Sequence, residues 1–193
     1  MNFTKKSLLD AQELLALVIA DRNLLSGLDR SIATMVKALN LDRKIFACGN
    51  GGSMCDSLHF TQELTGRYRK DRPPIAAVNM GEAGHISCVG NDYGFEFIFS
   101  RQLEALGKEG DVLLAISTSG NSPNVVSAAE KAKELKITSV GLLGKDGGKL
   151  KDLVDIPIIV PHRITDRIQE IHIKLIHIFI EGIERNLYPQ NYS

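Results

Sequence analysis

The sequence predicts an α/β protein of three layers, in which helices cover both faces of a parallel, five-stranded sheet. Short apolar runs indicate strands at about residues 44–48, 75–78, 112–116, 137–143 and 155–160. Segments with helical spacing of apolar residues separate these runs. Because strands and helices alternate along the chain, successive crossovers make the strands parallel and place helices on both sides.

The length and the charge balance limit the organisation and the partners of the chain. With 193 residues it is long enough for one well-buried domain and short for two, so we expect a single domain over residues 1–193, with a helical segment at 1–40 and an α/β core at 41–193. Lys+Arg and Asp+Glu are equal at 23 each. No bulk attraction to nucleic acid or to an anionic membrane is therefore predicted.

Neither export nor membrane insertion is indicated by the apolar segments. The apolar stretch near the N-terminus is interrupted by Asp10 and Glu13, unlike a signal peptide, and the apolar run at 171–180 contains polar and charged residues. The cysteines have no Cys-x-x-Cys spacing, which predicts reduced, buried thiols in a cytoplasmic protein; they are Cys48, Cys55 and Cys88.

Residues 4–40 have helical periodicity, and we expect a break within 23–27. The first part of this segment carries apolar residues on more than one face, which packing on a single sheet does not require. We therefore expect it to pack against another subunit.

A hydroxyl-rich turn at residues 117–122 follows the strand at 112–116 and precedes a helix that begins at Pro123. Four hydroxyl side chains lie within these six positions: Ser117, Thr118, Ser119 and Ser122. Such a turn offers O–H donors beside the free N–H groups of a helix N-terminus, which favours a phosphate. The alternative is an ordinary turn in which Ser122 caps the helix. The sequence lacks the Gly-x-x-x-x-Gly-Lys-Ser/Thr motif of nucleotide P-loops and the Gly-x-Gly-x-x-Gly motif of dinucleotide-binding folds. We therefore expect a sugar phosphate as the ligand.

A second junction of this kind follows the strand at 44–48. Its glycines allow a ligand to approach the backbone, Asn50 offers an amide, and Ser53 is expected to cap the next helix. A tight turn with positive φ explains the glycines equally well. A third loop, expected at 90–94, contains Asn91 and Asp92, which either shape a turn or bind sugar hydroxyls.

Two helices carry candidate metal-binding or acid/base residues. His59 and Glu63 are four residues apart on the helix expected at 53–65, a spacing that suits a divalent cation and also arises in surface pairs. The last helix, expected at 165–185, carries Gln169, His172 and His177. For His172 we favour a buried structural role with satisfied hydrogen bonds.

Taken together, these motifs resemble a sugar isomerase (SIS) domain, and more closely the bacterial phosphoheptose isomerases, over almost the whole chain. The resemblance is carried by residues 48–53 (CGNGGS), 59–68 (HFTQELTGRY), 85–92 (HISCVGND), 110–122 (GDVLLAISTSGNS), 144–148 (GKDGG) and 166–177 (DRIQEIHIKLIH). It implies a flavodoxin-like strand order, a homotetramer with N-terminal helices used in oligomerisation, and one Zn²⁺ per subunit.

The resemblance also implies the activity and the site residues. The expected reaction converts sedoheptulose 7-phosphate to D-glycero-D-manno-heptose 7-phosphate, the first step of ADP- or GDP-heptose biosynthesis and of lipopolysaccharide cores. Glu63 and His177 match the acid/base pair, and the zinc ligands match His59, Glu63, Gln169 and His177. The substrate contacts match Asn50, Gly51, Gly52, Ser53, Glu63, Asn91, Asp92, Ser117, Thr118, Ser119, Ser122 and Gln169.

The residue types suit an enediol mechanism, in which a carboxylate takes a proton from C1 and a histidine moves the oxygen proton. Whether Glu63 serves as base or as metal ligand stays open. Gln169 and His177 are eight residues apart, about 12 Å along a helix, which predicts a site completed at a subunit interface. The alternatives are a non-catalytic SIS protein, either a sugar-phosphate-binding regulator or a replication-initiator-binding protein, and an isomerase of a six-carbon sugar phosphate.

Overall fold

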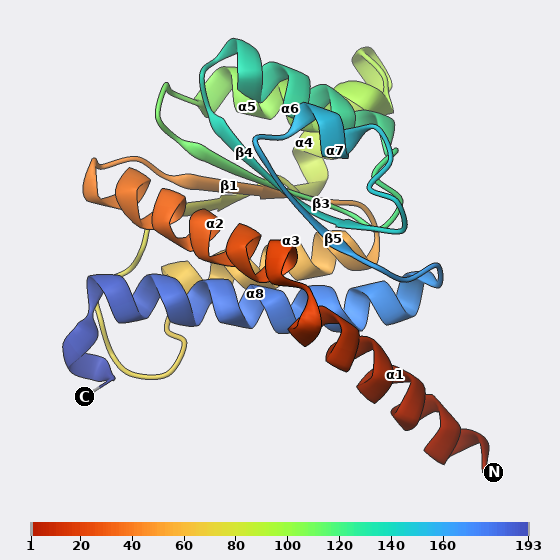
Figure 1. Ribbon diagram of the computed structural model, residues 1–193. Coiled ribbons are helices and arrows are strands. Elements are labelled where there is room, and N and C mark those ends of the chain that lie inside the picture. The colour runs from red at the N-terminus through yellow and green to blue at the C-terminus, as the bar shows by residue number, and fades with distance from the viewer. Residues whose placement is uncertain (1, 193) are drawn as a thin grey trace.

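The computed structural model describes residues 2–192, and its architecture is the expected three-layer α/β fold (Figure 1). Within these residues the elements follow in the order α1 (Phe3–Ala20), α2 (Arg22–Asn40), β1 (Ile45–Cys48), α3 (Gly52–Thr65), β2 (Ala77–Asn79), α4 (Ala83–Asp92), η1 (Phe95–Phe97), α5 (Ile98–Leu106), β3 (Val112–Ser117), α6 (Pro123–Glu134), β4 (Thr138–Gly144), α7 (Leu150–Leu153), β5 (Ile156–Val160), α8 (Thr165–Leu187) and η2 (Pro189–Asn191).

The five strands form one parallel sheet in the order β2-β1-β3-β4-β5. This is the flavodoxin-like order that the resemblance implies. The central strand β3 is buried along its whole length, and its register against β4 runs from Val112 opposite Thr138 to Ser117 opposite Leu143. A continuous apolar strand needs cover on both faces, which the helices provide.

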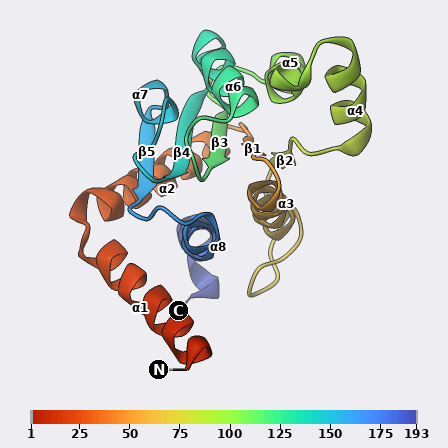
Figure 2. The ribbon, with the colours of Figure 1, turned by 90° about the vertical axis from the view of Figure 1, so that its right-hand side faces the viewer.

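The helices divide between the two faces of the sheet, as Figure 2 shows. Helices α2, α3 and α8 cover one face, where Met35, Phe60 and Phe179 belong to one buried apolar cluster. Helices α4 to α7 lie on the other face, where Phe99 and Ala128 belong to a second cluster. The sheet therefore separates two hydrophobic cores, and α3 and α8 share one of them.

Helix α1 projects from the body of the molecule (Figure 1). The break before α2 lies at Asp21, and the expected break at 23–27 was wrong. Asp21 Oδ1 accepts hydrogen bonds from the backbone N–H groups of Asn23 and Leu24, at 2.9 and 3.0 Å. An aspartate cap of this kind starts a new helix directly, so residues 23–27 are helical.

Several boundaries differ from the sequence-based expectation because a cap or a tertiary bond decides them. Strand β2 starts only at Ala77, since Ile75 N instead donates to Leu64 O at 3.0 Å. Helix α4 runs through Asp92, so the loop expected from residue 90 begins later. The carboxylate of Glu82 caps this helix and accepts from Gly84 N and His85 N. The single turn of α7 was not expected.

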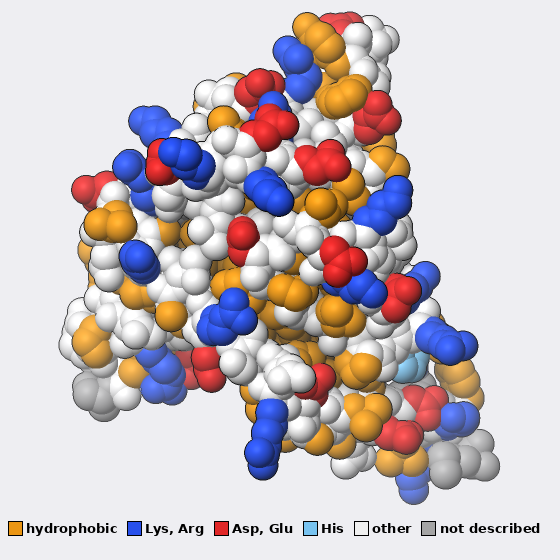
Figure 3. Space-filling view, turned by 45° about the horizontal axis from the view of Figure 1, so that its top comes forward, with side chains coloured by type: hydrophobic (Ala, Val, Ile, Leu, Met, Phe, Trp, Pro, Cys, Tyr) orange, Lys and Arg blue, Asp and Glu red, His pale blue; other side chains and the backbone are white. Residues whose placement is uncertain are grey.

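Hydrophobic side chains are exposed along α1, including Phe3 at 83%, Leu8 at 70% and Ile19 at 63%. In the space-filling view, the projecting corner next to the grey N-terminal residue carries hydrophobic side chains among charged ones (Figure 3). Among the described residues, no helix combines the length and the apolar character needed to cross a bilayer.

Candidate active site

The loops after β1 and β3 lie side by side, because the strand order reverses between these two neighbouring strands. In parallel α/β sheets, such a switch point is where ligands bind, outside the carboxyl ends of the strands. Both loops lead straight into helices, α3 from Gly51 and α6 from Ser122. The hydroxyl-rich junction predicted to bind phosphate and the glycine-rich junction are therefore adjacent.

A reciprocal amide pair joins the two loops. Asn50 Nδ2 donates to Asn124 Oδ1 and Asn124 Nδ2 donates to Asn50 Oδ1, both at 2.8 Å. Asn124 is 1% exposed. The expected role of Asn50 in contacting substrate is thus combined with a structural one, and Asn124 is a residue that the sequence analysis missed.

Neither helix at the switch point is capped by a side chain among the described residues. Gly51 precedes α3 with a φ of 55°, and Ser53 lies inside the helix, so the expectation that Ser53 caps it was wrong. At α6, Ser122 occupies the N-cap position but its Oγ lies 3.1 Å from Ser117 Oγ. The backbone N–H groups of two helix N-termini, with their positive dipole ends, thus face the same edge of the sheet.

Other hydroxyls of the second loop shape its backbone. Ser117 Oγ accepts from Gly120 N at 3.1 Å, and Ser119 Oγ accepts from Asn121 N at 3.2 Å. Ser117 is buried, whereas Thr118 and Ser119 are half-buried. The loop is thereby held in a fixed conformation, and each of these hydroxyls keeps further hydrogen-bonding capacity for an anion.

The candidate acid/base residues meet where α3 packs against α8. His59 on α3 and His177 on α8 approach each other with their Nε2 atoms 2.9 Å apart, and Glu63 Oε1 lies 4.0 Å from His59 Nε2. The two imidazole ring centroids are 5.1 Å apart, edge to face, and the Tyr68 ring lies 5.8 Å from that of His177. Three residues chosen from the sequence are therefore brought together within one chain.

The electrostatics of this cluster favour a neutral imidazole at His177. Partial burial lowers the pKa of His177, the charge of His59 lowers it further, and Glu63 opposes the change. A neutral imidazole can accept a proton or bind a metal, which a charged one cannot. Gln62 Nε2 lies 3.5 Å from His59 Nδ1, so a residue to which we assigned no role is next to this ring.

Gln169 belongs to α8, and its side chain lies beside the start of α3, in contact with Gly52. A Cβ atom added to Gly52 would come within 2.5 to 2.8 Å of the Gln169 side-chain amide. The two helices therefore run in the same direction, with Gln169 beside the first turn of α3 and His177 beside His59. Because Gln169 and His177 are eight residues apart on α8, each contacts a different part of α3.

The donor atoms suit zinc in kind, because two imidazole nitrogens, a carboxylate and an amide oxygen are available. Within residues 2–192, however, no three His, Cys, Asp or Glu side chains converge closely enough to form a ready metal cluster. Glu63 Oε1 lies 4.0 Å from His59 Nε2, farther than the 2.9 Å between the two imidazole Nε2 atoms.

Asn91 and Asp92 are not part of this arrangement. They lie at the exposed end of α4, on the opposite face of the sheet from α8 (Figure 2). Asn91 Nδ2 donates to Asp92 Oδ1 at 2.7 Å, and Asp92 Oδ2 lies 3.7 Å from Cys88 Sγ. Within one chain, these two expected substrate contacts therefore do not lie beside His59 and His177.

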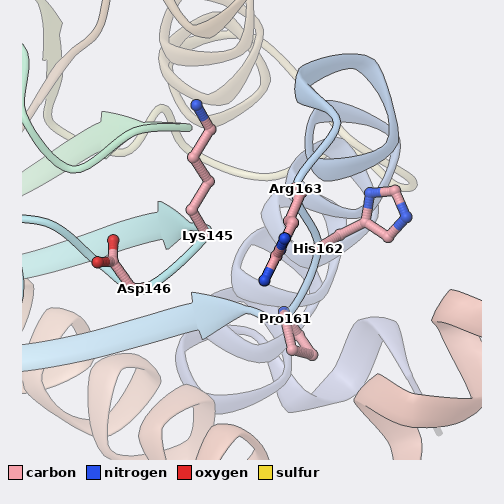
Figure 4. Close-up of a pocket in the computed structure, with 5 residues that line it drawn as sticks. All are labelled: Lys145, Asp146, Pro161, His162 and Arg163. Atoms are coloured by element: carbon pink, nitrogen blue, oxygen red, sulfur yellow. The ribbon is translucent and has the colours of Figure 1, made fainter.

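An open hollow of about 670 Å³ lies at the carboxyl ends of β4 and β5. Its lining contains no residue expected in the site: Lys145, Asp146, Pro161, His162 and Arg163. In Figure 4 the side chains of Lys145, His162 and Arg163 point in different directions. The size of a hollow is therefore a weaker guide to the site in this chain than the switch point and the residues around it.

Two further expectations about polar residues have mixed outcomes. His172 is fully buried and its Nε2 lies 3.0 Å from Leu143 O, as a core role predicts, but its Nδ1 has no partner among the described residues. Cys48 is buried, whereas Cys55 and Cys88 are exposed, so the expectation of buried thiols was wrong for these two. Both lie on helices, on faces turned away from the cores.

Comparison with known proteins agrees with this fold. The SIS domain family matches residues 10–144. The phosphoheptose isomerase of Fusobacterium nucleatum is 55% identical over 150 residues, covering 78% of this chain and 77% of that protein. The phosphoheptose isomerase of Tolumonas auensis is 51% identical over 184 residues, covering 95% and 96% of the two chains.

A solved structure extends the similarity to three dimensions. The phosphoheptose isomerase GmhA from Neisseria gonorrhoeae superposes with a TM-score of 0.88 at 38% identity, over 94% of this chain and 96% of that one. Sequence identity of this extent, together with the shared fold, leaves one assignment. The chain belongs to the SIS-domain family and, within it, to the phosphoheptose isomerases.

Proposed function

We propose that this chain isomerises sedoheptulose 7-phosphate to D-glycero-D-manno-heptose 7-phosphate through an enediol, as the first step of ADP- or GDP-heptose biosynthesis. The observation that carries the proposal is the position of His59, Glu63 and His177 on α3 and α8, next to a helix start that suits a phosphate. Relatives named phosphoheptose isomerase at about half identity over 95% of the chain support the same reaction.

The chemistry assigns distinct tasks to these residues. The Glu63 carboxylate takes a proton from C1 of the ketose, and the resulting enediol carries oxygen atoms on C1 and C2. His177, held neutral by its surroundings, moves a proton between these two oxygens. Return of a proton to C2 gives the aldose, so no atom or electron is gained or lost.

The phosphate end of the substrate is assigned to the switch point. The uncapped starts of α3 and α6 present the positive ends of their helix dipoles, and the hydroxyls of Ser117, Thr118 and Ser119 would supply hydrogen-bond donors. Binding the phosphate there fixes the substrate at a point remote from the reacting carbons. This separation lets binding energy orient C1 and C2 toward α8.

We also propose a single Zn²⁺ per subunit, which His59, Glu63, Gln169 and His177 would hold. When bound, the ion would act as a Lewis acid toward the substrate oxygens. This proposal is independent of the isomerase assignment, and metal analysis of the purified protein tests it. A protein that is free of metal and fully active would contradict it.

We also propose that the protein is a cytoplasmic homotetramer with sites at subunit interfaces. The exposed apolar residues of α1 support the assembly into an oligomer. Phe3, Leu8 and Ile19 would cover one another's apolar surface between subunits. Asn91 and Asp92, which lie far from the α8 cluster of their own chain, would then serve a neighbouring site. A monomer in sedimentation experiments at micromolar concentration would contradict this.

The test of the isomerase assignment is proton exchange. The protein is incubated with sedoheptulose 7-phosphate in deuterated water, and label at C1 and C2 is followed by NMR. We expect aldose to form with deuterium in the sugar. In Glu63→Gln the rate of this reaction should be about 10²- to 10⁴-fold lower. Glu130→Gln, on the exposed side of α6, is the control and should behave as the unmodified protein. Binding of phosphate without turnover would favour the alternative, a non-catalytic sugar-phosphate-binding protein.

A further inference from the structure

A buried ion pair connects the end of α3 to α8. Arg72 Nε donates to Glu184 Oε1 at 2.7 Å, and the side chains are 1% and 0% exposed. Arg72 lies in the segment between α3 and β2, and Glu184 lies near the end of α8. The two residues are 112 positions apart in the sequence, so only the packing of α3 against α8 brings them together.

The same guanidinium binds the backbone at the end of α3. Arg72 Nη2 donates to the carbonyl oxygen of Glu63 at 2.7 Å, and Nη1 donates to the carbonyl oxygens of Leu64 at 2.7 Å and Gly66 at 3.0 Å. A cation at this place also complements the negative end of the helix dipole. The backbone of the residue that we assign as the base is therefore held directly by Arg72.

Glu184 is equally well fixed. Its second oxygen, Oε2, accepts from the Tyr192 hydroxyl at 2.7 Å. Glu184 follows His177 by seven residues, which is about two helical turns, so the two side chains lie on the same side of α8. An unbroken series of bonds thus runs from the backbone of Glu63 through Arg72 and Glu184 to the helix that carries His177.

We propose that Arg72 and Glu184 are positioning residues that set the location of Glu63 and His59 relative to His177, and so determine the rate of the isomerisation. This role rests on the proposed function. Neither residue touches substrate in this arrangement; both act through α3 and α8.

Two considerations favour positioning over stability alone. A buried ion pair costs desolvation, and well-packed apolar residues often stabilise a fold as well or better. The apolar contacts between α3 and α8 are non-directional. The other polar contacts described above, Gln169 with Gly52 and His59 with His177, each involve a single pair of residues. The Arg72 fork is planar and binds several acceptors at once, so it restricts the relative placement of the helices more than a point charge would.

The first test compares Arg72→Met with Lys44→Met. Lys44 Nζ lies 2.9 Å from Asp111, a carboxylate that is 0% exposed and directly precedes β3 rather than lying on α3 or α8, so each variant leaves one buried carboxylate without its cation. At a temperature where both are folded, we expect kcat to fall at least about tenfold in Arg72→Met with little change in KM, since small displacements of catalytic groups are costly. Lys44→Met should keep kcat. Equal kcat values for both variants, whether retained or lost, would overturn the proposal.

Arg72→Lys separates charge from geometry. Lysine keeps the ion pair with Glu184 but cannot donate to the carbonyls of Glu63 and Leu64 at the same time. We expect it to recover thermal stability relative to Arg72→Met while kcat stays low. A kcat that recovers in parallel with stability would mean that the pair is structural only.

An activity-independent measurement distinguishes failure of this proposal from failure of the proposed function. The imidazole NMR signals of His59 and His177 report their mutual placement, and the chain has only five histidines to assign. We expect both signals to shift in Arg72→Met and to stay in place in Lys44→Met. Unshifted signals would overturn the positioning role even in an active enzyme. Shifted signals in a protein without turnover would contradict the isomerase assignment and leave the helix-positioning finding intact.

Discussion

The Nε2 atoms of His59 and His177 lie 2.9 Å apart, although 118 residues separate them in the chain. One ring belongs to α3 and the other to α8, and both helices cover the same face of the sheet. When both rings are neutral, one can donate a hydrogen bond and the other accept it. The candidate active centre is therefore a contact between two helices, α3 and α8.

Removal of the His177 imidazole should abolish most catalysis while leaving phosphate binding intact. In His177→Gln we expect kcat to fall by about 10²- to 10⁴-fold, because general acid/base catalysis is lost. Inorganic phosphate should still raise the melting temperature, since the switch-point loops are unchanged. His162→Gln, in the hollow after β5, is the matched control and should keep its kcat. A similar loss in both variants would contradict the assignment.

The amide pair between Asn50 and Asn124 should couple the two ligand-binding loops energetically. Asn124→Ala removes both hydrogen bonds of the half-buried Asn50 amide, and we expect the free energy of unfolding to fall by about 1–3 kcal/mol. Urea denaturation of the two single variants and the double variant gives the coupling energy, expected at about 0.5–3 kcal/mol. Additive effects would show that the two loops are independent.

A methyl group at Gly52 should displace Gln169 with little effect on the fold. The added Cβ would meet the Gln169 amide at 2.5 to 2.8 Å, and the end of this flexible side chain can move away. We expect Gly52→Ala to change the free energy of unfolding by less than about 1 kcal/mol, as alanine suits a helix start better than glycine does. Turnover of sedoheptulose 7-phosphate should nevertheless drop. Unchanged turnover would mean that Gln169 has no role in the reaction.

His172 should make the fold sensitive to acid. Burial lowers its pKa from 6.5 to about 4, so the folded protein favours the neutral ring. Its stabilising contribution is complete above pH 6.5 and is lost as the pH falls toward 4, up to about 3 kcal/mol for a shift of this size. His172→Gln can still donate to Leu143 O but does not titrate in this range. Urea midpoints between pH 7 and 4 should therefore fall less steeply in the variant, and parallel slopes would contradict the assignment.

Much of the fold and many site residues follow from local patterns. The strand at Val112–Ser117 is recognisable as a continuous apolar run, and the hydroxyl turn with Pro123 marks the next helix start. The break before α2 was misplaced because a single aspartate cap, Asp21, outweighs the turn-forming residues that follow it. Caps depend on one hydrogen bond, and periodicity does not reveal which candidate makes it.

The sequence by itself determined the alternating α/β order, the two glycine- or hydroxyl-rich junctions and the helices that carry His59, Glu63 and His177, because periodicity and turn chemistry are local properties. Only the tertiary structure decided that Asn50 pairs with Asn124 and that Arg72 binds both the Glu63 carbonyl and Glu184. These partners depend on which faces of α3, α6 and α8 meet above and below the sheet. That choice follows from packing two hydrophobic cores at once, and no segment of the chain encodes it alone.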